Sequence, residues 1–489
     1  MKEMLKKIVK TLLVLFFTLP IIMILFKSTG GFNSEWFSIL LPSLLNTFKI
    51  SLGSIIISFL IWIPSALLLW LYKIKYKKIF IWWFILWLIF PSYILALLYS
   101  DIFTFLYSDY WLMFILWLST SPYIFLLVYS SITNISDKYI LSWYSLWLSS
   151  FDIIRQIILP LLKPSIIIWT LVVLAETFSE FGATFLLWVN TVIVDVYTLW
   201  FSVNNYHTAS QFWLILIIIL ILVFLFFNPY KNNLFKYNNK VSSINTIYFE
   251  LSSKWKVLAY FYLYSVILLL FIIPLIILTI WLLKTYMVID VINVVKPLIN
   301  TIILSFISVF IITIFWYIIL RLFRKNSFIL NVFTSIYSIP WIIIWVSVLI
   351  ISPFVQWYIL AYIFLVLWIV LKFTPIFFNN LYWQYIKINP KLRKVWYSLG
   401  RSKLDYLQNI EIPLLYKWFL SWWILIFLEV IRELPITLLL KPFNFDTLAT
   451  KIFVYAETEQ IYLISVWIVL ILIISIIPII YIYKNKIKF

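Results

Sequence analysis

Residues 418–440 read WFLSWWILIFLEVIRELPITLLL, and residues 164–188 read PSIIIWTLVVLAETFSEFGATFLLW. Each stretch is long enough to cross a bilayer core of about 30 Å as a helix. Each also carries two glutamates four residues apart, Glu176 with Glu180 and Glu429 with Glu433. A carboxylate in hydrocarbon costs roughly 2.5–3.5 kcal/mol on insertion scales, so a pair that occurs twice indicates a function. The spacing predicts that both carboxyls of a pair lie on one face of a helix.

The composition of the whole chain is that of a membrane protein. It has 489 residues, of which 65% are hydrophobic and 11% charged, and its mean hydropathy is +1.07. No cysteine is present, which excludes disulfides, thiolate metal sites and cysteine catalysis. The sequence contains no Gly-x4-Gly-Lys-(Ser/Thr) loop, and its five glycines would hardly build a nucleotide-binding domain. Because no acid/base or nucleophile arrangement is found either, we expect no enzymatic activity.

The positive charge follows the membrane topology. The formal net charge is +19, and 29 of the 37 Lys and Arg residues lie in segments predicted to be cytoplasmic. This asymmetry is the positive-inside rule, so we expect no binding of nucleic acid. The basic residues 1–7, followed by an apolar run to Phe26 without a small-residue cleavage site, predict an uncleaved signal anchor. Both termini are therefore expected in the cytoplasm.

Apolar runs predict an all-α integral membrane protein with about twelve transmembrane helices. The segment 229–256 is rich in Asn, Lys and Ser, and we interpret it as a cytoplasmic linker between a first half, 1–228, and a second half, 257–489. Lys372 interrupts one run and makes it the weakest span. The predicted spans fall near 8–26, 44–72, 79–100, 112–132, 164–188, 211–228, 257–283, 299–320, 328–352, 357–380, 418–440 and 461–483.

The two halves are repeats of each other. Aligning 141–188 with 394–441, an offset of 253 residues, gives 16 identities without a gap, among them Trp, Asp, Pro and Glu. Upstream, Asn46-Thr47 matches Asn300-Thr301 at an offset of 254. Six spans per half is an even number, so both halves insert in the same orientation. Such parallel repeats predict a translocation path between the halves.

A matched cytoplasmic loop follows the fourth span of each half and carries a Pro at the start of the next helix. The second loop, with nine residues between Gly400 and Ile410, resembles the "EAA" loop of binding-protein-dependent ABC importer permeases. That resemblance implies a type I-like permease fold and a surface helix that docks on a separate ATPase subunit. Lys394-Val395-Trp396 replaces the family's Glu-Ala-Ala, and Trp147 replaces the first-half glycine. The residues that carry this expectation are Trp143, Tyr144, Ser145, Leu146, Ile157, Pro160, Trp396, Tyr397, Ser398, Leu399, Gly400, Ile410 and Pro413.

The segment 433–449, ELPITLLLKPFNFDTLA, resembles the second-half signature of ferric-iron permeases, with Lys441 in place of Arg. The first-half stretch 176–184 and the residues 197–201 are similar to the corresponding regions of that family. The signature positions here are Pro435, Thr437, Pro442, Phe443, Asp446 and Thr447.

The resemblance implies an importer that binds no cofactor itself and uses ATP through its partners. These would be two copies of an ABC ATPase on the cytoplasmic side and a soluble iron-binding receptor outside, with the chain in lipid of a bacterial inner membrane. Fe³⁺ prefers oxygen ligands, so Glu176, Glu180, Glu429 and Glu433, with Arg432, are candidates for the transport path. The alternative is that Arg432 pairs with a glutamate and only fixes helix packing. Thiamine permeases, a secondary transporter that uses the glutamates as proton carriers, and a non-transporting scaffold remain rival hypotheses.

Overall fold

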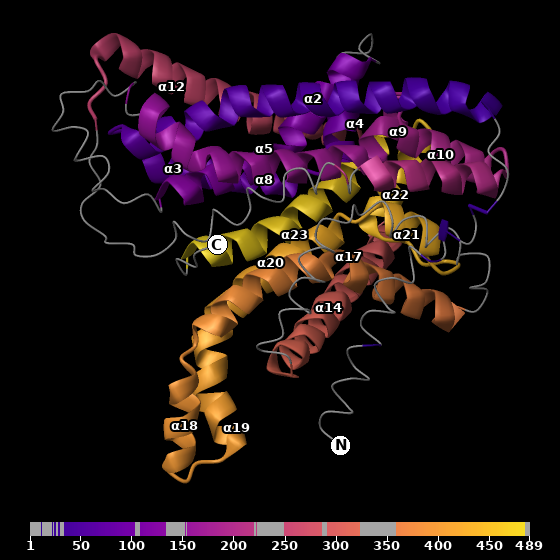
Figure 1. The fold of residues 1–489 in the computed structure, drawn as a ribbon. Coiled ribbons are helices and arrows are strands. Elements are labelled where there is room, and N and C mark those ends of the chain that lie inside the picture. Colours follow the sequence, from indigo (N-terminus) through magenta and orange to yellow (C-terminus); the bar gives the residue numbers. More distant parts are fainter. Residues whose placement is uncertain are drawn as a thin grey trace. The chain divides into compact units, whose positions relative to one another are not determined.

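The computed structural model describes residues 34–102, 108–133, 154–219, 249–285, 291–322 and 358–484, together with a few isolated positions (Figure 1). Within these ranges the secondary structure is helical, with one isolated bridge between Tyr72 and Phe249. The predicted spans 328–352 and, for the most part, 8–26 lie outside the described residues, as do the first loop residues 143–146 and most of the linker.

Four described helices are long and apolar enough to cross a membrane. They are Trp36–Leu71, Ser253–Thr285, Val294–Leu320 and Ile461–Tyr481. A fifth is obtained if Lys403–Tyr416 and Phe419–Ile431, which meet at a bend of 58°, form one span. The chain is therefore a helical protein with the character of a membrane-embedded one. The expected total of twelve spans in two parallel repeats stays a prediction.

The first compact unit comprises Gly31–Thr285. Its long helix α2 packs along α5, and α8 packs against both (Figure 1). Buried aromatic rings fill the interior, where the Trp62 ring meets the rings of Phe84 and Phe125 edge-on at 5.0 and 5.7 Å. Its helices are α2 (Ser34–Leu71), α3 (Lys77–Leu86), α4 (Ser92–Ile102), α5 (Asp109–Thr133), α8 (Leu159–Phe178), α9 (Gly182–Leu186), α10 (Val192–Phe201), α12 (Ser253–Ile267) and α13 (Ile273–Thr285).

The described residues from Val291 to Lys484 belong to the second compact unit. Here α14 packs against α17 and α20, and α22 packs against α23. A buried hydrogen bond from Trp316 Nε1 to Thr374 Oγ1, 2.9 Å long, links α14 to α17. The helices are α14 (Val291–Leu322), α17 (Tyr358–Lys387), α18 (Pro390–Ser398), α19 (Lys403–Tyr406), α20 (Ile412–Ile431), α21 (Pro435–Leu440), α22 (Leu448–Glu457) and α23 (Ile464–Lys484).

The compact units and the sequence repeat divide the chain at different places. The helical path Ser253–Thr285, which the sequence places at the start of the second half, packs within the first unit. Polar contacts hold it there: Trp281 Nε1 donates to Asp101 Oδ2 at 2.8 Å, and the Tyr99 hydroxyl donates to the Leu269 carbonyl. The boundary of the unit therefore falls after Thr285, because these side chains find their partners on α4.

Candidate functional site

Both helices that carry the paired glutamates are broken at the pair. Helix α8 ends at Phe178 and α9 begins at Gly182, while α20 ends at Ile431 and α21 begins at Pro435. The second glutamate of each pair therefore lies in the break, beyond the end of the helix. The prediction that both carboxyls share one face of a continuous helix was wrong. In the second half Pro435 contributes to the break, because it has no N–H to donate to the Ile431 carbonyl and its ring would collide with that carbonyl in a continuous helix.

The second glutamate of each pair binds the start of the short helix that follows. Glu433 Oε1 accepts a hydrogen bond from the backbone N–H of Ile436 at 3.2 Å, and Glu180 Oε1 accepts one from Ala183 at 3.0 Å. A carboxylate at this position satisfies a backbone donor that has no partner within the helix. The same geometry in both halves indicates that these two glutamates have a structural task, whatever else they do.

The threonine four residues later completes this arrangement. Thr437 Oγ1 donates to the carbonyl oxygen of Glu433 at 2.6 Å, and Thr184 Oγ1 donates to that of Glu180 at 2.7 Å. Glu433 and Thr437 are both buried. The repeat found in the sequence is therefore reproduced here as the same local structure in both units.

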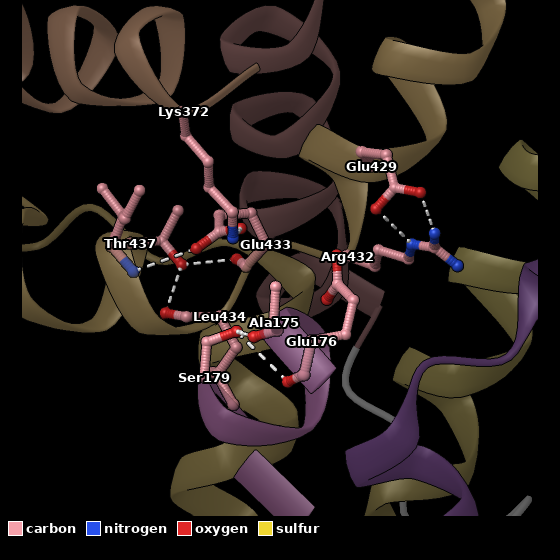
Figure 2. A network of polar contacts seen from close by, with 10 residues as sticks. Ala175, Glu176, Ser179, Lys372, Glu429, Arg432, Glu433, Leu434 and Thr437 are labelled. Atoms are coloured by element: carbon pink, nitrogen blue, oxygen red, sulfur yellow. Dashed lines mark hydrogen bonds and ion pairs between the residues drawn. The ribbon is translucent and has the colours of Figure 1, made fainter. Parts of the chain in front are cut away.

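Two ion pairs accompany the second-half glutamates (Figure 2). Lys372 extends from α17 to the Glu433 carboxyl, with 19% and 3% of the two side chains exposed. Arg432 pairs with Glu429 through its guanidinium, at 3.1 Å from Nε to Oε2. The sequence anticipated the second pair as one of two alternatives. It did not anticipate the first, although Lys372 was visible as a charge within an apolar run.

The first half differs at the positions of both cations. At the repeat offset of 253 residues, Ser179 corresponds to Arg432, and the same offset extended upstream of the aligned stretch sets Ser119 against Lys372. Ser179 Oγ instead donates to the carbonyl oxygens of Ala175 and Glu176, at 2.6 and 3.1 Å (Figure 2). This stretch therefore has two carboxylates and no cation at either matched position.

A second set of hydrogen bonds that occurs in both units is made by an Asn-Thr pair. In one unit, the Asn300 amide donates to the Asp446 carbonyl at 3.0 Å, and Thr301 Oγ1 accepts from the Leu448 N–H at 2.8 Å. Thr301 thereby satisfies the first backbone donor of α22 from a neighbouring helix. The sequence showed the Asn-Thr match but gave no role for it, because the hydrogen-bond partners lie about 146 residues away in the chain.

The first unit contains the same contacts. The Asn46 amide donates to the Asn190 carbonyl at 2.8 Å, and Thr47 Oγ1 accepts from the Val192 N–H at 3.2 Å, where α10 begins. Each unit thus uses an Asn-Thr pair of its long helix to hold the start of a short helix.

The signature segment has mostly structural tasks in this chain. Pro435 lies in the first turn of α21, and Thr447 caps α22 with Thr450. Asp446 pairs with Lys441 at 2.7 Å and with Lys451 at 3.0 Å. Burial raises the pKa of Asp446, but hydrogen bonds from the two lysines outweigh it and hold that pKa below its ordinary value. Pro442 is buried, whereas Phe443 is 93% exposed.

The second of the two matched loops forms a helical hairpin, residues 390–406, that continues into α20. Asn389 caps α18 by accepting from the Lys391 N–H at 2.9 Å. Gly400 provides the turn with a φ of +73°, a conformation that favours glycine. Ser402 and Asp405 then cap α19 reciprocally. Of the expected loop residues in the first half, Trp143 to Leu146 lie outside the described residues.

A π-helical turn joins each loop to its span. Residues 407–411 form one turn and residues 154–158 form the other, at the repeat offset of 253, and each ends two residues before Pro413 or Pro160. Ile410 and Ile157 lie within these turns. As the sequence predicted, each proline lies in the first turn of an α-helix, Pro160 in α8 and Pro413 in α20. The sequence did not predict the π turn that directly precedes each of these helices.

Comparison with known proteins gives no relative for this chain: no family model and no curated protein matches it. Within the described part, no three His, Cys, Asp or Glu side chains lie close enough together to hold a metal ion.

Proposed function

We propose that this chain is the permease subunit of an ATP-driven importer of the bacterial inner membrane, with ferric iron as its substrate. In this proposal the two halves enclose the path, and both termini lie in the cytoplasm. Two copies of a separate ATPase subunit bind the cytoplasmic loops, and a soluble iron-binding receptor delivers the substrate from outside.

The observation that carries the proposal is the helical path between the second loop and the carboxylates. It runs from Lys403 through the π turn to Ile431, 29 residues, or about 43 Å of helix at 1.5 Å per residue. Glu429 lies near its far end, and the loop hairpin precedes its start. In this proposal, movement of the hairpin is transmitted to the broken helix along two helical segments, Lys403–Tyr416 and Phe419–Ile431, which meet at a bend of 58°. An energy source at the loop and a gate at the carboxylates would use this connection.

The glutamates that both halves carry support a path for a cation. In the second half, Lys372 and Arg432 neutralise Glu433 and Glu429. The matched first-half stretch keeps Glu176 and Glu180, with serines at both cation positions. Carboxylates are the hard oxygen donors that Fe³⁺ prefers. We therefore propose that the passing cation meets these glutamates, while the second-half pairs also hold their helices in position.

The proposal is tested by reconstituting the chain in liposomes with the ATPase subunit that copurifies from its native membranes. Uptake of radioactive ferric iron from the receptor should require ATP on the loop side. Gly400→Val should keep assembly and abolish uptake, because a side chain with a β-branch is strained at φ +73°. Thiamine supplied in parallel serves as the competing substrate.

Two results would contradict the proposal in different ways. Uptake driven by a proton gradient without ATP would favour a secondary transporter, with the glutamates as proton carriers. Uptake of thiamine and not iron would keep the importer and replace its substrate. Glu176→Gln with Glu180→Gln should abolish iron uptake while the protein still assembles; failure of assembly would assign these residues to packing.

A further inference from the structure

The hairpin 390–406 exposes a stripe of apolar side chains. Leu392, Val395 and Leu399 follow one another at helical spacing, and these residues are 43%, 56% and 68% exposed, respectively. Leu404, on α19, is 68% exposed as well. Figure 1 shows α18 and α19 together at the tip of this unit, away from α14, α21 and α23. Exposed apolar side chains with a polar border are typical of an interaction site.

The packing of the hairpin uses its other side. The Tyr397 and Tyr406 rings meet at 6.2 Å and join α18 to α19, and Tyr406 is buried. Arg393 Nε donates to the Tyr397 hydroxyl at 3.0 Å. Because these contacts already hold the two helices together, the apolar stripe is not needed for the folding of the hairpin.

A strongly basic border surrounds the stripe. Lys391, Lys394, Arg401 and Lys403 are exposed, and among the described residues none of them forms an ion pair. The acidic residue of the hairpin, Asp405, accepts a hydrogen bond from the Ser402 N–H at 3.1 Å. The border therefore presents four positive charges next to a single carboxylate that is engaged in capping.

We propose that this surface binds a groove with an apolar floor and an acidic rim, on the ATPase subunit, with Asp or Glu facing Lys391 and Lys394. The inference rests on the proposed function. Lys394 stands where the resembling loops have glutamate, so the charge across this contact is reversed relative to that pattern. Apolar contact supplies the affinity, and opposite charges around it select the partner.

The geometry favours a protein over the lipid surface as the occupant. The segment Lys403–Tyr416 is 14 residues, or about 21 Å long. It is inclined by 58° to Phe419–Ile431. For a span that begins at Phe419, near the start of the predicted span 418–440, and follows the membrane normal, the far end of Lys403–Tyr416 stands about 11 Å beyond the bilayer core, whereas the headgroup layer is only about 5–8 Å thick. With this boundary the hairpin extends past the lipid.

The test compares a charge reversal on the hairpin with a matched one elsewhere. The full-length chain is reconstituted in nanodiscs of neutral lipid, and its affinity for the ATPase subunit that copurifies from native membranes is measured. Lys391→Glu with Lys394→Glu should weaken binding by about 100-fold and remove most of its salt dependence. Lys254→Glu with Lys256→Glu, two exposed lysines of the first unit, should leave the affinity unchanged.

A second measurement locates the contact. Because the chain contains no cysteine, Val395→Cys introduces a single thiol, which should react with a maleimide and be protected when the ATPase is bound. If no ATPase copurifies with the natural chain, the proposed function fails. If an ATPase binds but the hairpin reversal keeps its affinity, the function stands and the acidic groove is refuted. Protection of the introduced thiol by anionic lipid alone would assign the surface to the membrane.

Discussion

Removal of the Lys372 ammonium should destabilise the protein through the carboxyl that it leaves behind. Only 3% of the Glu433 side chain is exposed, so its charge has little access to water. Breaking a buried pair in this way costs about 3–5 kcal/mol. Lys372→Met, which keeps most of the apolar stem, is therefore expected to lower the free energy of unfolding by that amount.

Removing the charge of Glu433 instead should lower the free energy of unfolding by less. Lys372 is 19% exposed, and its stem lets the ammonium approach the surface when its partner is removed. Glu433→Gln also keeps an oxygen that accepts from Ile436. We expect a loss of about 1–3 kcal/mol for this variant. The double variant has neither charge, so its loss should be smaller than the sum of the two by at least about 2 kcal/mol.

The assay is equilibrium unfolding of the full-length chain in mixed micelles, with SDS as denaturant and far-UV circular dichroism as readout. The control is the exposed pair of Lys49 and Asp109, 2.9 Å apart with 48% and 30% of the side chains exposed. The coupling energy of this pair should be much smaller than that of the buried pair, because solvent screens exposed charges. Additive losses for Lys372→Met and Glu433→Gln would refute the buried pair. Iron uptake by the folded double variant then shows whether Glu433 has a task in transport.

Three further predictions concern single contacts. Thr301→Val removes the acceptor for the Leu448 N–H and should cost about 1–3 kcal/mol in the same unfolding assay; a loss below 0.5 kcal/mol (about the noise of such measurements) would contradict the contact. Burial raises the pKa of Asp195 to about 6, offset in part by its hydrogen bond from Ser43, so the native state binds more protons than the unfolded chain between about pH 4 and 6. Stability should fall as the pH rises through that window, and Asp195→Asn should remove the fall. Trp188 is 85% exposed with a φ of 54°, a conformation that costs about 1–2 kcal/mol, so Trp188→Gly should unfold at a higher denaturant concentration and not a lower one.

The sequence predicted those features that depend on composition and repetition. Apolar length identifies long helices, because an unsatisfied backbone group is too costly in lipid for any other local structure. The Asn300-Thr301 match identified two positions that have the same contacts in both units. The Arg432–Glu429 pair was one of the alternatives that spacing along one helix allowed. All of these signals are local in the chain or copied within it.

The remaining features depend on distant partners. Lys372 is 61 residues from Glu433, so a lysine that weakened a predicted span is one half of a buried ion pair. The broken helices were also missed, although Pro435 gave a signal in the second half. In the first half the break has no proline, and Gly182 begins α9. Helix periodicity reads both stretches as continuous because the side-chain pattern does not change at the break.

The prolines show how much a single residue type can predict about local helix geometry. Three π turns in the described residues each end two residues before a proline: Pro160, Pro274 and Pro413. A proline ring collides with the carbonyl four residues earlier, which is the middle residue of each turn, and widening the helix moves that carbonyl aside. Yet Pro64 and Pro478 lie inside helices assigned as α. Proline alone therefore does not produce the wide turn. Both repeats nevertheless have a π turn between the loop and the span, where a uniform α-helix would connect the two equally well. We therefore infer that the π turn itself has a role in connecting the loop to the span.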